Sequence, residues 1–423
     1  MTERLLQFIW EFQYFNKRDL ETITGERIQI LQQGRLNANQ GPDFSDARIR
    51  IGETMWAGNV ELHVRGSDWN KHGHQHDQHY RNVVLHVVWT HDSGPSGDEA
   101  PGIPVLELRN RVSKILLGRY EEMMNTGTFI PCESAIGRIK KLTWTAWKDR
   151  LVAERLTRKA MLPAGFSRQN NHHWEETCWW MLARNFGIVV NADAFEEVAR
   201  TIPISVLSKL KHHPLLVEAI LFGQAGLLQD SYTDEYPQAL LREYRFLQQK
   251  FNLRPVNRPI LFLRMRPGNF PTIRMAQLAA LINSSEHLFS AMLEADSVEK
   301  IKSFFDVTAS AYWDNHYRFD EMSPEKKKNL GEGMIENIII NTVSPLLFAY
   351  GTYHRQEAMQ ERALNWLEAL DPENHTITTR FQQLGIRNRH AFDSQALTEL
   401  KNEYCNKKRC LDCAVGTSLL RGL

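Results

Sequence analysis

The chain has 423 residues, enough for two or three domains that each bury a core of their own. Hydrophobic residues make up 42% of it and charged residues 24%, which excludes a disordered or fibrous protein. The formal net charge of +1 excludes a global basic field, so any attraction to nucleic acid has to come from local patches.

Membrane and secretory classes are also disfavoured. No segment approaches the ~20 consecutive apolar residues that span a bilayer, and the N-terminus lacks the pattern of a signal peptide. Five cysteines are an odd and low number, which argues against a secreted disulfide scaffold. We therefore expect a cytoplasmic protein without a membrane partner; the sequence carries no signal for an oligomeric state.

The first 110 residues predict a small domain of one main helix and several strands. Apolar residues recur at helical spacing over residues 3–16. A polar, histidine-rich stretch at 68–81, with a short helix, precedes the last long strand. Alternating or β-branched patterns predict strands at 27–31, 47–51, 56–64, 82–89 and 105–108.

From residue 111 onward the pattern is helical almost throughout, and the proline-containing stretches 206–215 and 254–271 are expected to be turns. We therefore predict an α+β protein, with a small N-terminal helix–three-strand–helix–strand domain at residues 1–110 and a large all-α domain at residues 111–423. The candidate helices are 111–125, 142–160, 172–186, 193–200, 214–224, 237–251, 273–284, 286–294, 298–304, 333–350, 354–369 and 394–405.

Three residues of the N-terminal domain are the strongest candidates for a catalytic or metal-binding site. Asp43 opens the second strand, and Glu61 and His63 lie two residues apart on the third, so they share a face. If the second strand begins at Asp43, all three side chains meet at one edge of the sheet. Two carboxylates in such proximity are costly unless a cation neutralises them, and a hard divalent ion such as Mg²⁺ prefers these oxygens.

Pro42-Asp43 and Glu61-Leu62-His63, in this order of elements, resemble the two motifs of the PD-(D/E)XK nuclease superfamily. The resemblance covers roughly residues 1–110. It implies that Asp43 and Glu61 hold Mg²⁺ or Mn²⁺ and that His63 acts on the attacking water, although lysine is usual at that position. On the alternative interpretation, Pro42-Asp43 forms an ordinary turn and Glu61 is a solvated strand residue.

Seven of the sixteen histidines lie between His63 and His91. Imidazole is the commonest metal ligand and carries protons near neutral pH. His72, His74 and His76 could therefore contact a scissile phosphate, or bind Zn²⁺ or Mn²⁺, although they lack the spacing of a known zinc helix. A polar loop that happens to be rich in histidine is the alternative.

Three of the five cysteines, Cys405, Cys410 and Cys413, lie within nine positions, as suits zinc or an iron–sulfur cluster. Cys132, after Pro131 in a loop, is the expected fourth ligand, whereas Cys178 has the surroundings of a core thiol. The spacing favours a 4Fe–4S cluster over zinc. A remote cysteine with a C-terminal trio resembles the iron–sulfur staple of RecB-like nucleases, where the remote cysteine precedes the nuclease core. Reduced structural thiols are the alternative.

Three arginines, Arg264, Arg266 and Arg274, surround a Pro/Gly turn that opens a helix. A helix N-terminus with guanidinium groups nearby attracts phosphate, so this patch is a candidate for substrate binding. On the alternative interpretation, the arginines pair with acidic helices and brace the fold.

The favoured hypothesis is a Mg²⁺- or Mn²⁺-dependent phosphodiesterase that acts on nucleic acid. A catalytically inactive protein of nuclease fold, which binds nucleic acid or a protein partner, is the first alternative, and a histidine-rich zinc hydrolase is the second. The whole chain also resembles an uncharacterised bacterial family of similar length, through the stretches Gly41–Phe44 and Gly58–His63 and a cysteine-bearing end.

Overall fold

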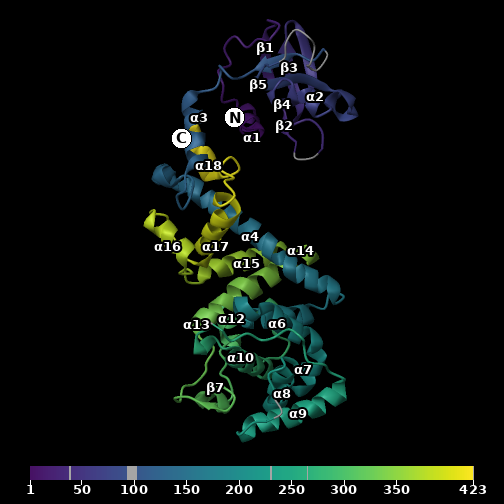
Figure 1. The fold of residues 1–423 in the computed structure, drawn as a ribbon, viewed down its shortest axis with the longest axis vertical. Helices are drawn as coiled ribbons and strands as arrows, with labels where there is room; N and C mark the ends of the chain where they lie inside the picture. Colours follow the sequence, from purple (N-terminus) through teal and green to yellow (C-terminus); the bar gives the residue numbers. More distant parts are fainter. Residues whose placement is uncertain (38–39, 93–101, 229–230, 264, 423) are drawn as a thin grey trace. The chain divides into compact units, whose positions relative to one another are not determined.

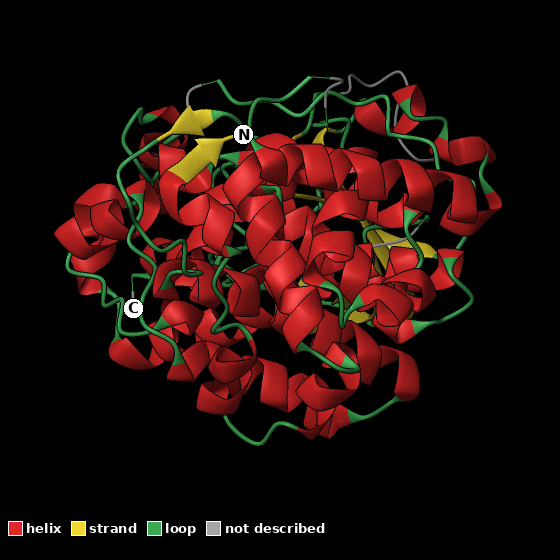
Figure 2. Ribbon diagram, turned by 90° about the horizontal axis from the view of Figure 1, so that it is seen from below, coloured by secondary structure: helices red, strands yellow, loops and turns green. Residues whose placement is uncertain are grey.

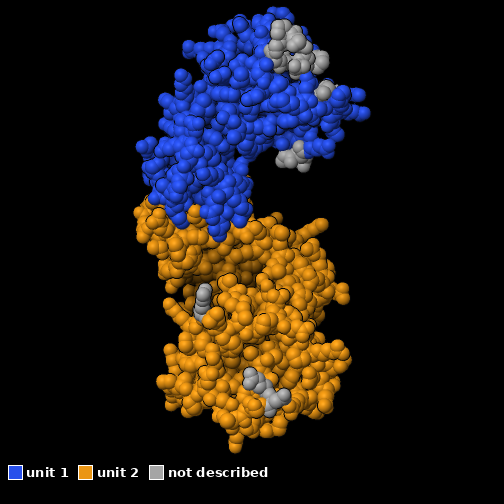
Figure 3. Space-filling view, viewed as in Figure 1, with its two compact units in different colours: residues 1–144, 402–423 blue, residues 145–401 orange. Residues whose placement is uncertain are grey.

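The computed structural model describes residues 1–37, 40–92, 102–228, 231–263 and 265–422. They form two compact units (Figure 3): residues 1–144 together with 402–423, called here the sheet unit, and residues 145–401, called the helical unit. Both ends of the chain belong to the sheet unit (Figure 1). The C-terminal cysteine segment therefore shares a unit with the sheet, whereas the sequence placed it in a helical domain beginning at residue 111.

The sheet unit is built around a mixed six-stranded sheet of order β1-β3-β4-β5-β6, with β2 paired to β3. Strands β1, β3 and β4 form an antiparallel meander, and β5 and β6 run parallel to β4. The predicted α+β class is confirmed. The predicted order of one helix, three strands, a short helix and a strand needs one correction, because β2 is a fourth strand before the short helical segment. The strands are β1 (Ile28–Gln32), β2 (Arg35–Leu36), β3 (Phe44–Ile51), β4 (Thr54–Arg65), β5 (Val83–Thr90) and β6 (Val105–Glu107).

The pattern of buried residues along each strand shows which faces of the sheet are covered. β3 alternates between buried and exposed positions from Ala47 to Ile51, as in a strand with one covered face. The first six residues of β5 are all buried, as expected of a parallel strand covered on both faces. Helix α1 (Glu3–Glu11) packs its apolar face against β4. Between β4 and β5 lie α2 (Asp68–Lys71) and two 3₁₀ turns, η1 (His74–His76) and η2 (Gln78–Tyr80).

The remainder of the sheet unit contains α3 (Lys114–Asn125), the 3₁₀ turn η3 (Glu133–Arg138) and α18 (Ala414–Arg421), which packs against α3. Helix α18 was not predicted. Its apolar residues are few, and two of them, Val415 and Leu420, are buried by packing onto a segment far away in sequence. Among the described residues, every helix is too short or too polar to cross a membrane.

Helices predominate in the chain as a whole, as Figure 2 shows. Helix α4 (Lys141–Gln169) begins in the sheet unit and continues into the helical unit. The further helices of the helical unit are α5 (Trp174–Phe186), α6 (Ile188–Thr201), α7 (Ile204–Leu210), α8 (Pro214–Gln224), α9 (Glu235–Phe251), α10 (Pro271–Ser284), α11 (Leu288–Glu294), α12 (Val298–Phe304), α13 (Glu332–Ile338), α14 (Ser344–His354), α15 (Glu357–Ala369), α16 (Thr376–Gln383) and α17 (Ala391–Glu399); it also holds a small ribbon of β7 (His316–Arg318) and β8 (Glu321–Met322).

Four sequence-based expectations for this unit need correction. The ribbon of β7 and β8 lies in a domain that was predicted to be all-α. Helix α7 occupies part of the segment predicted as a turn, because Leu207 and Leu210 are buried on one face of a short helix. The predicted helix 333–350 is interrupted by a π-helical segment over residues 339–343. Pro345 follows this segment; proline has no N–H and clashes with the preceding turn, which a wider turn relieves. Helix α16 was not predicted.

A buried polar seam joins α4 to α17 within the helical unit. Lys148 Nζ lies 2.8 Å from Asp393 Oδ1, and both side chains are buried. Two turns further along α4, Arg155 donates to the side chains of Gln395 at 2.5 Å and Glu399 at 3.2 Å, both on α17. Such pairs hold the two helices in one register, since breaking one partner leaves an uncompensated buried charge.

Gly223 allows α8 and α9 to approach closely, because a Cβ at this position would lie 2.1 Å from the ring of Tyr244. We expect Gly223→Ala to lower the free energy of unfolding by about 1–3 kcal/mol through overpacking. Gly165→Ala, in α4 with open space around the new methyl group, should raise it by about 0.5–1 kcal/mol. Urea titration followed by far-ultraviolet circular dichroism compares the two; equal effects would contradict the prediction.

Candidate metal centre

Two members of the site lie on β4. Glu61 and His63 are two residues apart, so their side chains leave the same face of the strand. His63 Nε2 lies 3.6 Å from Glu61 Oε1. Only 5% of Glu61 and 0% of His63 is exposed to solvent. The pair is therefore shielded from water and points to a common position.

Asp43 lies beside Glu61 because β3 and β4 pair in antiparallel fashion. The two residues are linked through backbone groups: the Asp43 N–H donates to Glu61 Oε2 at 2.9 Å, and the Leu62 N–H donates to Asp43 Oδ2 at 3.2 Å. Gln7 of α1 donates its side-chain N–H to Asp43 Oδ1 at 2.8 Å. These hydrogen bonds fix the orientation of both carboxylates before any ligand arrives.

Two further histidines reach this position from the segment between β4 and β5. His72 Nδ1 lies 3.1 Å from His63 Nε2, and His74 Nε2 lies 3.5 Å from Glu61 Oε1. One nitrogen each of His63, His72 and His74 lies within 4.8 Å of the other two. His76, predicted with them, is exposed and is not part of this group. We call Glu61, His63, His72 and His74 the histidine–carboxylate cluster.

His86 supports the cluster from behind. It lies on β5, fully buried, with Nε2 2.9 Å from His63 Nδ1. When His63 uses Nε2 as a metal ligand, its proton is on Nδ1 and is donated to His86 Nε2. Such a partner fixes the tautomer and the ring orientation of a ligating histidine.

Aromatic rings hold the histidine segment in place. Tyr80 stacks on His74 with ring centroids 3.8 Å apart. Trp69, only 2% exposed, lies edge-on to His74 at 5.4 Å and tilted against His86 at 5.2 Å. These contacts explain how a segment with little regular structure presents His74 in a defined orientation.

The electrostatics of the site favour a bound cation. Burial raises the pKa of both Asp43 and Glu61, and the negative charge of Asp43 raises the pKa of Glu61 further. Burial lowers the pKa of His63 to about 2 and that of His86 to about 3, so both rings are neutral at physiological pH. Neutral imidazole is the form that binds metal, and a divalent ion would offset the repulsion between the carboxylates.

The spacing of the cluster fits a transition-metal ion. Ligand atoms held about 2.0–2.2 Å from a tetrahedral zinc ion are about 3.3–3.6 Å apart. The three separations measured in the cluster are 3.1, 3.5 and 3.6 Å. His74 Nε2 has no hydrogen-bond donor or acceptor partner among the described residues, as suits an atom that is left for an ion. Imidazole ligands favour zinc, iron, nickel or copper over Mg²⁺.

The sequence reasoning overlooked two residues of α1 that face the site. Gln7 bonds to Asp43, and the charge of Glu3 contributes to the raised pKa of Asp43. The sequence contained a signal for both, because Glu3 and Gln7 are four residues apart and so share a helix face. Glu11, one turn further, interacts with the charges of Arg4 and Arg421 instead.

The predicted arginine patch belongs to the helical unit and not to the unit that holds the cluster. Arg264 lies outside the described residues. Arg266 is exposed. Arg274 is buried, and its guanidinium donates to Gln277 at 2.9 Å and to Asn269 at 2.6 Å. These contacts occupy the Arg274 guanidinium with uncharged amide groups of its own helix and the preceding turn, and not with the acidic helices of the alternative interpretation.

The predicted cysteine group gathers in the sheet unit. Cys132, Cys410 and Cys413 are buried, and Cys405 is half-buried. Burial raises the pKa of Cys132 to about 12, and the charges of Cys413 and Cys410 contribute, so these three thiols lie near one another. No three of the cysteine sulfurs in the described residues lie within 4.8 Å of one another. Cys178 lies inside α5 in the helical unit.

Together these features define an α+β protein in which the buried Glu61 and His63 of the sheet meet the half-buried His74 and the exposed His72 of the following segment. The chain belongs to the DUF2851 family of proteins of unknown function, which matches residues 3–376. The matched range includes the whole sheet and all four members of the cluster, and it ends before Cys405. Comparison with curated proteins and with solved structures found no match.

We predict that the purified protein retains a stoichiometric divalent transition-metal ion through dialysis. His74→Ala removes one candidate ligand and should lower the affinity about 100-fold or more, judged against the 10–100-fold cost of losing even an outer partner. Metal content is measured by mass spectrometry after dialysis. His76→Ala, in the same segment but outside the cluster, is the matched control and should retain the ion. Equal loss in both variants would contradict the site.

Proposed function

We propose that the protein is a metal-dependent phosphodiesterase that acts on nucleic acid. The observation that carries the proposal is the histidine–carboxylate cluster. One nitrogen each of His63, His72 and His74 lies within 4.8 Å of the other two, and Glu61 Oε1 lies 3.6 Å from His63 Nε2 and 3.5 Å from His74 Nε2. In this proposal Glu61, His63, His72 and His74 bind the ion. His72 and His74 therefore act as metal ligands, rather than as the phosphate contacts that the sequence suggested.

Each group of the chain has a defined task. When bound, the ion supplies Lewis-acid stabilisation of charge on the phosphate and acidifies water. Asp43 acts as a positioning residue, because its N–H holds Glu61 Oε2 and its own carboxylate is fixed by Leu62 and Gln7. Hydrolysis joins the water oxygen to phosphorus and breaks one ester P–O bond, whose oxygen leaves with a proton.

The nucleic-acid substrate is supported by the order of elements. A helix, an antiparallel meander, a short helical segment and a parallel strand follow one another, with Asp43 before the second long strand and Glu61 on the third. This is the layout that the resemblance to PD-(D/E)XK nucleases implies. His63 in place of the usual lysine is consistent with an ion that is bound by imidazole.

A second candidate is a non-catalytic protein that binds nucleic acid or a protein partner. One observation favours it: the cluster offers four side chains, three imidazoles and the Glu61 carboxylate, and a zinc ion that is bound by four protein ligands is structural. A catalytic site needs an open position, which a five- or six-coordinate ion in the same cluster would keep. The absorption spectrum of the Co²⁺-substituted protein separates the two, because tetrahedral Co²⁺ absorbs visible light far more strongly than octahedral Co²⁺.

We expect the protein to cleave single- or double-stranded DNA or RNA when supplied with Mn²⁺ or Zn²⁺. Asp43→Asn should lower the rate about 10–100-fold, because it removes the negative charge beside Glu61 and disturbs the hydrogen bonds from Leu62 and Gln7 without removing a ligand. Glu61→Gln should lower it at least as much. Cleavage is followed on labelled oligonucleotides by gel electrophoresis.

Asp46→Asn is the matched control for this experiment. Asp46 lies on the same strand as Phe44, is exposed, and has a left-handed φ of 60° that asparagine tolerates. It should cleave like the unaltered protein. Cleavage by Asp43→Asn at the unaltered rate, or absence of cleavage with any ion and substrate, would refute the phosphodiesterase; salt-dependent binding without cleavage would favour the second candidate.

We further propose that Cys132, Cys405, Cys410 and Cys413 hold a 4Fe–4S cluster. The proximity of three buried thiols, one of them far away in sequence, supports this. Tetrahedral zinc would require sulfur atoms about 3.8 Å apart, as follows from Zn–S distances of about 2.3 Å. The absence of three cysteine sulfurs within 4.8 Å among the described residues favours the larger group.

Anaerobically purified protein should then be brown and contain iron and sulfide. Cys410→Ser should lose the colour, whereas Cys178→Ala, which changes a core thiol of the other unit, should keep it. Absorption spectroscopy and iron analysis measure both. Colourless protein that contains zinc in place of iron would overturn the iron–sulfur assignment.

A further inference from the structure

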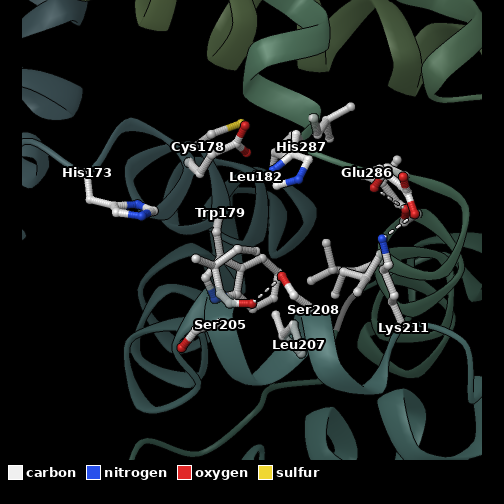
Figure 4. A pocket seen from close by; sticks show the side chains of 17 residues that line it. His173, Cys178, Trp179, Leu182, Ser205, Leu207, Ser208, Lys211, Glu286 and His287 are labelled. Carbon is white, nitrogen blue, oxygen red and sulfur yellow. Dashed lines mark hydrogen bonds and ion pairs between the residues drawn. The ribbon is translucent and has the colours of Figure 1, made fainter.

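The helical unit contains a cavity of about 300 Å³ between α5, α7 and α10, closed on one side by residues 285–288 (Figure 4). This volume is at the lower end of the range for small-molecule sites. The cavity belongs wholly to the helical unit and shares no residue with the histidine–carboxylate cluster. It therefore calls for an explanation of its own.

The walls of the cavity are aliphatic. Leucine and isoleucine side chains come from all three helices, and the ring of Trp179 lies among them (Figure 4). The thiol of Cys178 also lines the space and is buried, and burial holds its pKa well above the ordinary value. Such a lining favours an apolar, uncharged body. The aliphatic residues are Leu182, Ile204, Leu207, Leu278, Leu281, Ile282 and Leu288.

One side of the cavity carries an ion pair. Lys211 Nζ lies 2.5 Å from Glu286 Oε1 (Figure 4). The side chain of Lys211 is only 18% exposed, whereas that of Glu286 is 69% exposed. The hydrogen bond from Lys211 lowers the pKa of Glu286, and the charges of Lys211, His212 and His287 lower it further. A carboxylate at this position is therefore surrounded by groups that stabilise negative charge.

The other acidic group of the lining is already occupied. Glu175 accepts hydrogen bonds from the backbone N–H groups of Phe289 and Ser290, at 3.2 and 3.0 Å, at the start of α11. Ser208 donates to the carbonyl of Ile204 at 2.9 Å. Lys211 is the one lysine or arginine among the described residues that line the cavity.

We propose that this cavity binds a small aliphatic carboxylic acid, whose chain lies against the leucine and isoleucine side chains and whose carboxylate pairs with Lys211 in place of Glu286. Without a ligand, the Glu286 carboxylate occupies the position beside Lys211 that the ligand carboxylate would take. It loses little on displacement, because an exposed carboxylate returns to water at almost no cost. The ligand carboxylate gains the same partner while its chain leaves water. This site is independent of the proposed phosphodiesterase activity.

Octanoate is the probe for the full-length protein, with 1-octanol as its uncharged counterpart, and isothermal titration calorimetry measures both. We expect saturable binding of octanoate and binding of 1-octanol about tenfold weaker or less, as the loss of a charge-assisted hydrogen bond implies. Absence of saturable octanoate binding overturns the proposal, and so does equal affinity for the two probes.

Two variants test the role of Glu286 at Lys211. Lys211→Met should weaken octanoate binding about tenfold or more, whereas Glu286→Gln should strengthen it several-fold because it removes the competing carboxylate. Lys209→Met is the control and should bind like the unaltered protein, because Lys209 is an exposed residue of α7 that lies two residues before Lys211 and outside the lining. Unchanged binding by Lys211→Met, or weaker binding by Glu286→Gln, overturns the proposal. Thermal melting of each variant confirms that it is folded.

Discussion

The central constraint on this structure is the placement of the buried Glu61 and the half-buried Asp43 beside the imidazole of His63, which burial keeps neutral. Burial disfavours the charged forms, and Asp43 and Glu61 repel each other when both are ionised. The arrangement becomes favourable when a cation occupies the position that the side chains share. Helix α1, the residue before β3, strands β4 and β5 and the histidine segment supply the side chains of this site and their hydrogen-bond partners.

The four members of the cluster are presented by two different kinds of backbone. Glu61 and His63 stand on a central strand, where the sheet register fixes their positions. His72 and His74 come from a segment of short helical turns, held by stacking of Tyr80 and packing of Trp69. The outer partners, His86 and Gln7, complete the support.

The helical unit uses charge in a different way. Its α4 and α17 are held together by buried ion pairs such as Lys148–Asp393, which contribute to a defined helix register. The Lys211–Glu286 pair, in contrast, stands at the rim of an aliphatic cavity with one partner exposed. A buried pair cannot exchange its partner at low cost, whereas a half-exposed pair can. This difference separates a structural contact from a candidate binding site.

The α+β class, the main helices and the strand carrying Glu61 and His63 follow from local periodicity, which depends only on neighbours in sequence. Their shared face follows from strand alternation alone. Other features depend on contacts between distant segments. These contacts place His74, and not His76, beside His63 and bring Gln7 and His86 to the site. They also bring Cys132 close to the C-terminal cysteines. Helix α18 and the cavity of the helical unit likewise exist only through packing. Sequence spacing determines from which face of a strand or helix a side chain projects. Only the tertiary structure determines which residues of distant segments pack against that face.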